Sequence, residues 1–163
     1  MNASDILFYG HQTVLKTIDG LAEEDWYTGG VCGVWSVREI MSHLASYEKM
    51  LVDILNSLLN DKPTPTLRRM MEHGPYVFND LEVGDRQGQN MADALAEYSD
   101  TQAQTMALIA QIPLASQRQK GVLAWYGDAY DLEDFLVYTY YGHKREHTAQ
   151  IDVFRDSLKN RDA

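Results

Sequence analysis

Two histidines one helical turn apart, His143 and His147, are the residues in this sequence whose type and spacing best suit metal chemistry. Side chains at positions i and i+4 lie on the same face of a helix, so both imidazoles can reach one ion without a change in the backbone. The spacing alone is a weak signal, because the chain has five histidines and short motifs often arise by chance. The surrounding pattern must therefore decide which way the pair faces.

Apolar residues recur around the pair at steps of three and four, from Leu132 to Leu158. This period puts both histidines on the helix face that packs against a core. A pair of core histidines satisfied by hydrogen bonds would give the same pattern. Because two adjacent buried imidazoles without a ligand leave several polar nitrogens to satisfy, we favour the metal interpretation.

A third histidine, His43, follows the clearest helix start of the sequence. Ser36 and Glu39 have the spacing of a capping box and predict a helix over residues 36–60. His43 lies three residues after Ile40, on the apolar side of that helix. Three inward-facing histidines on two long helices match the three-histidine-plus-water pattern of open metal sites.

Two more helices are predicted. Ser4 can cap a helix that runs to about residue 22, and Asn90 can cap another that ends before Pro113. Asp131, with Asp134 at the third helical position, starts the helix that carries the histidine pair. Four long amphipathic helices with little convincing strand predict an all-α four-helix bundle.

The stretches between these helices are long. Residues 61–89 hold three of the four prolines and no sustained period, and indicate a connection with at most one short helix around residues 67–72. Connections of this length are often functional, and together with residues 114–130 this one could wall a pocket. The total of 163 residues suits one domain, so we expect a single domain over residues 1–163.

Composition excludes several classes of protein. The net charge of −10 repels phosphate backbones and anionic lipid surfaces, so we expect neither nucleic acid nor a membrane as a partner. A single cysteine, Cys32, excludes an internal disulfide framework and fits a reducing compartment. The chain shows no secretory signal and no apolar stretch of about 18 residues, which predicts a soluble cytoplasmic protein.

Two stretches resemble a known family. Residues 35–44 (WSVREIMSHL) and residues 142–151 (GHKREHTAQI) resemble the signatures of the second and fourth helices of the DinB/YfiT-like family. The resemblance covers nearly the whole chain. It implies an up-down-down-up bundle that holds one divalent metal through three histidines, here His43, His143 and His147. Members of this family include metal-dependent transferases that use low-molecular-weight thiols such as mycothiol and bacillithiol, and a maleylpyruvate isomerase.

A second resemblance points to a different activity. Residues 125–127 (WYG) and 141–143 (YGH) look like the ClbS/DfsB-like branch of four-helix proteins, whose known activity is cyclopropane hydrolysis in self-protection against a genotoxin. That activity does not rest on a three-histidine metal site. The intact histidine set therefore favours the metal-binding interpretation.

Three neutral imidazoles would leave a divalent Zn, Ni, Fe or Mn ion with its full charge and an open position. We therefore expect a metal-dependent enzyme that joins a low-molecular-weight thiol to a small electrophilic molecule. The alternatives are a metal-dependent or ClbS-like hydrolase and a non-catalytic dimeric binding protein. We expect a homodimer in each case, since dimers are frequent among the proteins that this chain resembles.

No catalytic residue follows from the spacing. Glu39 is engaged by the capping box, and Glu146 points about 100° away from either neighbouring histidine. Gln150 and Tyr47 face the right way to support the ligands or line a pocket, and core packing is an equally good role for both. Arg38, Lys144 and Arg145 could offer a positive rim to an anionic thiol.

Overall fold

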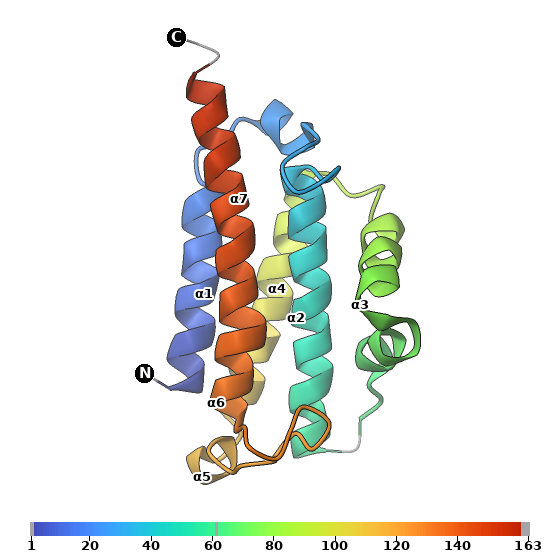
Figure 1. The fold of residues 1–163 in the computed structure, drawn as a ribbon, viewed down its shortest axis with the longest axis vertical. Coiled ribbons are helices and arrows are strands. Elements are labelled where there is room, and N and C mark those ends of the chain that lie inside the picture. The colour runs from blue at the N-terminus through green and yellow to red at the C-terminus, as the bar shows by residue number, and fades with distance from the viewer. Residues whose placement is uncertain (1, 61, 161–163) are drawn as a thin grey trace. The chain divides into compact units, whose positions relative to one another are not determined.

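The computed structural model describes residues 2–60 and 62–160, and in this part of the chain the regular structure is helical (Figure 1). An isolated β-bridge joins Cys32 and Trp35. The all-α prediction is confirmed. In chain order the elements are α1 (Ala3–Ile18), the 3-10 helix η1 (Glu23–Tyr27), α2 (Val37–Leu59), α3 (Pro65–Asp85), α4 (Met91–Ile109), α5 (Leu114–Gln117), α6 (Leu132–Phe135), the π-helix η2 (Leu136–Tyr141) and α7 (Gly142–Lys159).

These helices form two compact units. The central unit consists of residues 20–108, and the terminal unit combines residues 1–19 with residues 109–163. The boundary falls at the end of α4, so that Ile109, its last residue, belongs to the terminal unit. The single domain over residues 1–163 stays a prediction.

In the terminal unit α1 and α7 pack against each other and run in the same direction (Figure 1). The up-down-down-up order requires this direction of the first and last long helices. Gly10 allows a close approach, because a Cβ atom there would lie 3.3 Å from Cδ of Lys144 and 3.3 Å from the ring of Tyr141. The backbones of the two helices therefore meet at Gly10.

Capping boxes start two helices of this unit. The side chain of Asn2 accepts a hydrogen bond from the Asp5 N–H, and Asp5 reciprocates, so the predicted cap at Ser4 is wrong by two residues. Ser4 lies inside the first turn instead. Asp131 and Asp134 make the same exchange at the start of α6, which confirms the predicted start of the last long helix.

The last long helix contains a π-helical segment. The helix continues from α6 through η2 into α7, but the N–H of Gly142 bonds to the carbonyl of Val137, five residues back. The π-helical segment ends at Tyr141, two residues before His143. Segments of this kind are rare and often lie at functional sites. The sequence did not predict this segment, because apolar residues at steps of three and four do not distinguish a π-helical turn from an α-helical one.

In the central unit α2 begins and ends as predicted. The Ser36 N–H donates to Glu39 Oε2 at 2.8 Å, and the Glu39 N–H donates to Ser36 Oγ at 3.4 Å. With Ser36 as the N-cap and Asn60 as the C-cap, the helix matches the predicted range of 36–60. Within this unit α2 and α4 run in the same direction (Figure 1).

Where the sequence analysis expected a long connection, the structure has α3. This part of the prediction is wrong. Gly74, with φ of 75°, breaks α3 into two segments just before Pro75, which explains why no single helical period was visible. Asp53 of α2 caps the N-terminus of α3 by accepting hydrogen bonds from the Thr66 N–H at 2.7 Å and the Leu67 N–H at 3.0 Å. Tertiary contacts thus stabilise a helix that its own sequence indicates only weakly.

None of the helices in the described part of the chain has both the length and the apolar character that crossing a membrane requires. The cytoplasmic location stays a prediction.

Candidate functional site

His143 and His147 face each other on α7 in the terminal unit. Their Nε2 atoms lie 3.0 Å apart and their ring centroids 4.7 Å apart, with the ring planes inclined by 66°. His147 is 6% exposed and His143 is half-buried. The predicted proximity of the two rings on one side of the helix is therefore confirmed.

The separation of the two nitrogens can be tested against a metal ion. An ion at about 2.05 Å from each Nε2, the usual distance for imidazole, would bind them at an angle of roughly 94°. A regular tetrahedral angle would need a separation of about 3.3 Å. The pair therefore fits a chelate after at most a small ring rotation.

Both rings are neutral at physiological pH. Burial lowers the pKa of His143 to about 3, with further lowering by the nearby charges of His147 and Lys144. Burial also lowers the pKa of His147, although the hydrogen bond with Gln150 and the charge of Glu146 oppose this effect. Since a metal ligand must be deprotonated, burial prepares both imidazoles for binding.

Gln150 contacts the outer nitrogen of His147. Its Oε1 atom lies 2.9 Å from Nδ1 of His147 on the same helix. Metal-binding histidines commonly donate their second ring N–H to such an acceptor, which fixes the orientation of the ring. The structure thus places Gln150 in direct contact with His147, and its role as support for a metal ligand stays a prediction.

The three cationic side chains expected at the rim differ in exposure. Lys144 is 2% exposed, and Arg38 is buried with its Nη1 donating to the carbonyl of Arg86 at 3.1 Å. Arg145 is exposed and lies over the ring of Tyr141, 5.9 Å from its centroid. Arg145 is thus the member of this set that can meet a solute directly.

His43 lies in the central unit and is 2% exposed, which confirms its predicted inward orientation. Its ring contacts Trp35 at 5.0 Å and Tyr47 at 4.8 Å between centroids. Both neighbours are half-buried. Burial raises the pKa of Tyr47, while a hydrogen bond with Asn79 acts in the opposite direction. Tyr47 therefore stays a phenol at neutral pH.

The other histidines lie elsewhere. His11 is half-buried on α1, and His73 is exposed on α3. Glu39 makes the capping box, as expected, and Glu146 is exposed. The structure therefore identifies no general base among these candidates.

A buried polar cluster in the central unit was missed by the sequence analysis. Glu48 is fully buried and accepts a hydrogen bond from Thr105 Oγ1 at 3.2 Å. Burial raises the pKa of Tyr98 well above its usual value, and the negative charge of Glu48 adds to this effect. The signal was present in the sequence, because Glu48 lies between Leu44 and Leu51 on the apolar stripe of α2.

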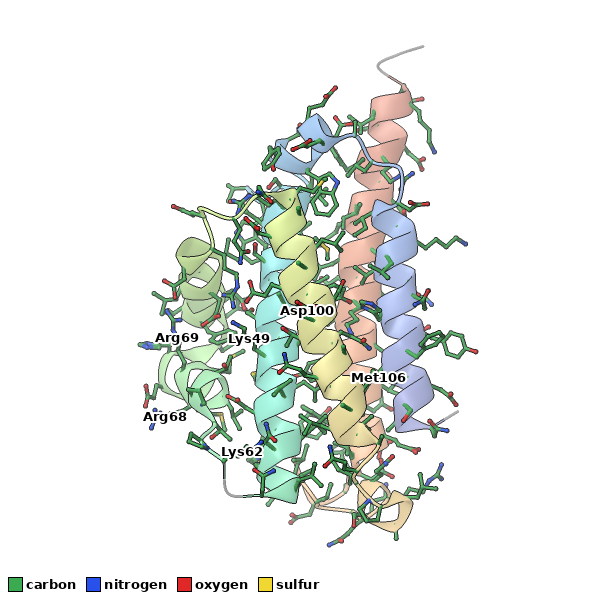
Figure 2. The ribbon with its side chains drawn as sticks, turned by 180° about the vertical axis from the view of Figure 1, so that it is seen from behind. Lys49, Lys62, Arg68, Arg69, Asp100 and Met106 are labelled. Atoms are coloured by element: carbon green, nitrogen blue, oxygen red, sulfur yellow. The ribbon has the colours of Figure 1, made fainter. Side chains whose placement is uncertain are left out.

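A polar cavity of about 420 Å³ in the central unit was also not foreseen. Figure 2 labels Lys49 of α2 and Arg69 of α3 on the same side of this unit. Lys49 pairs with Glu97 at 2.9 Å, and Arg69 pairs with Glu82 and Asp85 at 2.7 Å each. These charged side chains pair with one another and thereby link α2, α3 and α4. We therefore interpret the cavity as part of the packing between these helices.

Comparison with known proteins agrees with the resemblance found in the two histidine motifs. Residues 9–151 match the family model of the DinB superfamily. No curated protein and no solved structure matches the chain. The match confirms the predicted DinB-like all-α fold class.

Proposed function

Because the chain belongs to the DinB superfamily, we propose that it is a metal-binding protein in which His43, His143 and His147 hold one divalent transition metal. The observation that carries the proposal is the pair of neutral imidazoles on α7, with Nε2 atoms 3.0 Å apart. Among the described residues, these three histidines are the set of His, Cys, Asp or Glu side chains that could hold an ion. Imidazole suits Zn, Ni and Fe, so the identity of the metal depends on availability.

An ion held by three neutral imidazoles keeps its full charge and an open position, where it would lower the pKa of a bound thiol or water. We propose that the substrate pair is a low-molecular-weight thiol and a small electrophile. The thiolate sulfur forms a bond to the electrophilic carbon, the leaving group departs with the electron pair of the broken bond, and the thiol proton passes to solvent.

Metal content tests the first part of this proposal. The protein without a histidine tag is reconstituted with Zn, Ni, Fe or Mn, and metal per chain is measured by elemental analysis. We expect close to one ion per chain, with loss in His43→Ala and His147→Ala. His73→Ala is the matched control, because His73 is exposed on α3. No metal after reconstitution, or full retention in both variants, would refute the site.

Activity tests the second part. Metal-loaded protein is mixed with electrophiles and a panel of low-molecular-weight thiols, and conjugates are followed by mass spectrometry. We expect conjugation that is lost in His143→Ala. Conjugation that persists unchanged in this variant would exclude the metal mechanism, whereas turnover that ignores thiol and consumes water would identify a hydrolase. Metal binding without any turnover would favour the alternative of a non-catalytic dimeric binding protein.

A further inference from the structure

Two aromatic side chains of the central unit contact the ring of His43. The ring centroid of Trp35 lies 5.0 Å and that of Tyr47 lies 4.8 Å from the centroid of His43, with ring planes inclined by 43° and 61°. His43 is 2% exposed, whereas Trp35 and Tyr47 are half-buried. These two rings therefore combine contact with a proposed metal ligand and accessible apolar surface of their own.

The backbone of Trp35 is held by hydrogen bonds within its loop. The Trp35 N–H donates to the carbonyl of Cys32 at 2.9 Å, and the Trp35 carbonyl accepts from the Val31 N–H at 2.9 Å. Ser36, the next residue, is the N-cap of α2. The indole is thus attached to a backbone that is fixed on both sides.

Tyr47 is held by the second segment of α3. Its side chain makes a hydrogen bond with Asn79, and its ring centroid lies 6.0 Å from that of Phe78, with ring planes inclined by 76°. Phe78 is fully buried, so packing sets its position. The helix that the sequence did not predict therefore supports an aromatic side chain next to His43.

We propose that Trp35 and Tyr47 bind a planar aromatic group of the electrophile, so that the site prefers aromatic electrophiles to aliphatic ones. A ring bound there gains offset-stacked or edge-to-face contacts with the two side chains. Because both side chains are already held in place, little conformational entropy is lost when the ligand binds. This inference rests on the proposed function, because it names the substrate class of the same site.

Binding of an unreactive pair of ligands tests this preference without any turnover. Nitrobenzene and nitrocyclohexane carry the same polar group on a six-membered ring that is planar in the first and puckered in the second. Their Kd values are measured by equilibrium dialysis, with the free ligand quantified by gas chromatography. Since an aromatic pair is worth about 0.5–1.5 kcal/mol beyond its buried area, we expect nitrobenzene to bind about 2- to 10-fold more tightly.

Variants locate the preference. Trp35→Leu and Tyr47→Leu should each reduce the preference for nitrobenzene, whereas Tyr47→Phe keeps the ring and should retain it. Tyr76→Leu on α3 and Trp125→Leu in the terminal unit make the same changes at exposed positions and should leave the preference unchanged. Circular dichroism confirms that each variant is folded. Equal affinities of the two ligands in the unaltered protein, or an unchanged preference in folded Trp35→Leu and Tyr47→Leu, would overturn the proposal and leave these rings as packing around His43.

Kinetics connect the binding preference to the proposed reaction. With 1-chloro-2,4-dinitrobenzene, the thiolate sulfur bonds to the ring carbon that carries chlorine, and chloride leaves with the electron pair of the broken bond. Tyr47→Leu should raise the KM for this electrophile by about 2- to 10-fold and leave the KM for iodoacetamide, which has no ring, unchanged. Equal changes in both KM values would contradict a role in selecting the ring.

The outcomes separate the inference from the proposed function. Absence of metal binding or of any conjugation would refute the proposed function, whereas the two unreactive ligands would still decide whether Trp35 and Tyr47 bind an aromatic group. Conjugation that depends on His143 but treats aromatic and aliphatic electrophiles alike would keep the proposed function and overturn the substrate preference.

Discussion

Arg86, at the end of α3, binds Glu97 of α4 through two sides of its guanidinium group. Nε lies 3.0 Å from Oε2 and Nη2 lies 2.9 Å from Oε1 of Glu97, while Nη1 donates to Glu82 Oε2 at 2.7 Å. Arg86 and Glu82 are both buried. One cation therefore holds two carboxylates and attaches the end of α3 to α4.

Removing Arg86 should destabilise the protein strongly. Arg86→Ala leaves the buried Glu82 and the largely buried Glu97 without their main partner, and breaking a buried pair in this way costs about 3–5 kcal/mol. The free energy of unfolding is measured by urea titration followed by circular dichroism. Arg68→Ala is the control, because Arg68 is 72% exposed in its pair with Glu72, and its loss should change stability by less than about 1 kcal/mol. Equal effects of the two variants would contradict the role of Arg86.

Glu97 should make part of the stability depend on pH. Burial by itself would raise the pKa of Glu97, but hydrogen bonds from Arg86, Gln89 and Lys49 outweigh burial and lower the pKa to about 2. Because the folded pKa lies below the unfolded value near 4.5, this contribution is present above pH 4.5 and is lost as the pH falls toward 2. Because solvent screens a carboxylate that is only partly buried, we expect this contribution to be on the order of 1–2 kcal/mol.

Glu97→Gln tests this dependence. The difference in free energy of unfolding between the unaltered protein and Glu97→Gln should be largest near pH 7 and should shrink as the pH falls from 5 toward 2. Urea titrations at a series of pH values measure it. A difference that stays constant over this interval would show that Glu97 is not the group that titrates.

The close contact of α1 and α7 at Gly10 should not accept a side chain. Gly10→Val places atoms against Tyr141 and Lys144, and overpacking of this kind costs about 1–3 kcal/mol. Thermal unfolding followed by circular dichroism measures the change. Gly84→Val is the matched control, because no atom lies within 4 Å of a Cβ added at that exposed helical position. A stability of Gly10→Val that equals the control would show that the helices can separate without cost.

We expect the protein to self-associate as a homodimer. The terminal unit exposes several large apolar side chains on α1 and η2, among them Phe8, Tyr9 and Tyr138. Exposed apolar surface of this kind often marks an interaction site. Sedimentation velocity at tens of micromolar should show a dimer, and Tyr138→Ser should shift the distribution toward the monomer. A single monomeric species in the unaltered protein would refute the expectation.

Local sequence determined the helix starts and the histidine pair. The capping box of Ser36 and Glu39 is satisfied within four residues, and the spacing of His143 and His147 places both rings on one face of any helix. These features depend on bonds and angles inside a single helix, so they could be predicted without knowing the fold. The inward orientation of His43 followed from the same periodicity.

The tertiary structure decided two features that the local pattern did not show, the helix α3 and the rotamer of Gln150. α3 contains Gly74 and Pro75, which oppose a continuous helix, and it is stabilised by Asp53 of α2 and by the bond between Arg86 and Glu97 of α4. These partners lie 11 to 14 residues away along the chain, beyond the reach of a local pattern. Periodicity placed Gln150 on the correct face of α7, but the rotamer that brings its oxygen to His147 Nδ1 depends on side-chain packing. Side-chain conformations of this kind are set by the surrounding structure, because several rotamers are open to the same residue on an isolated helix.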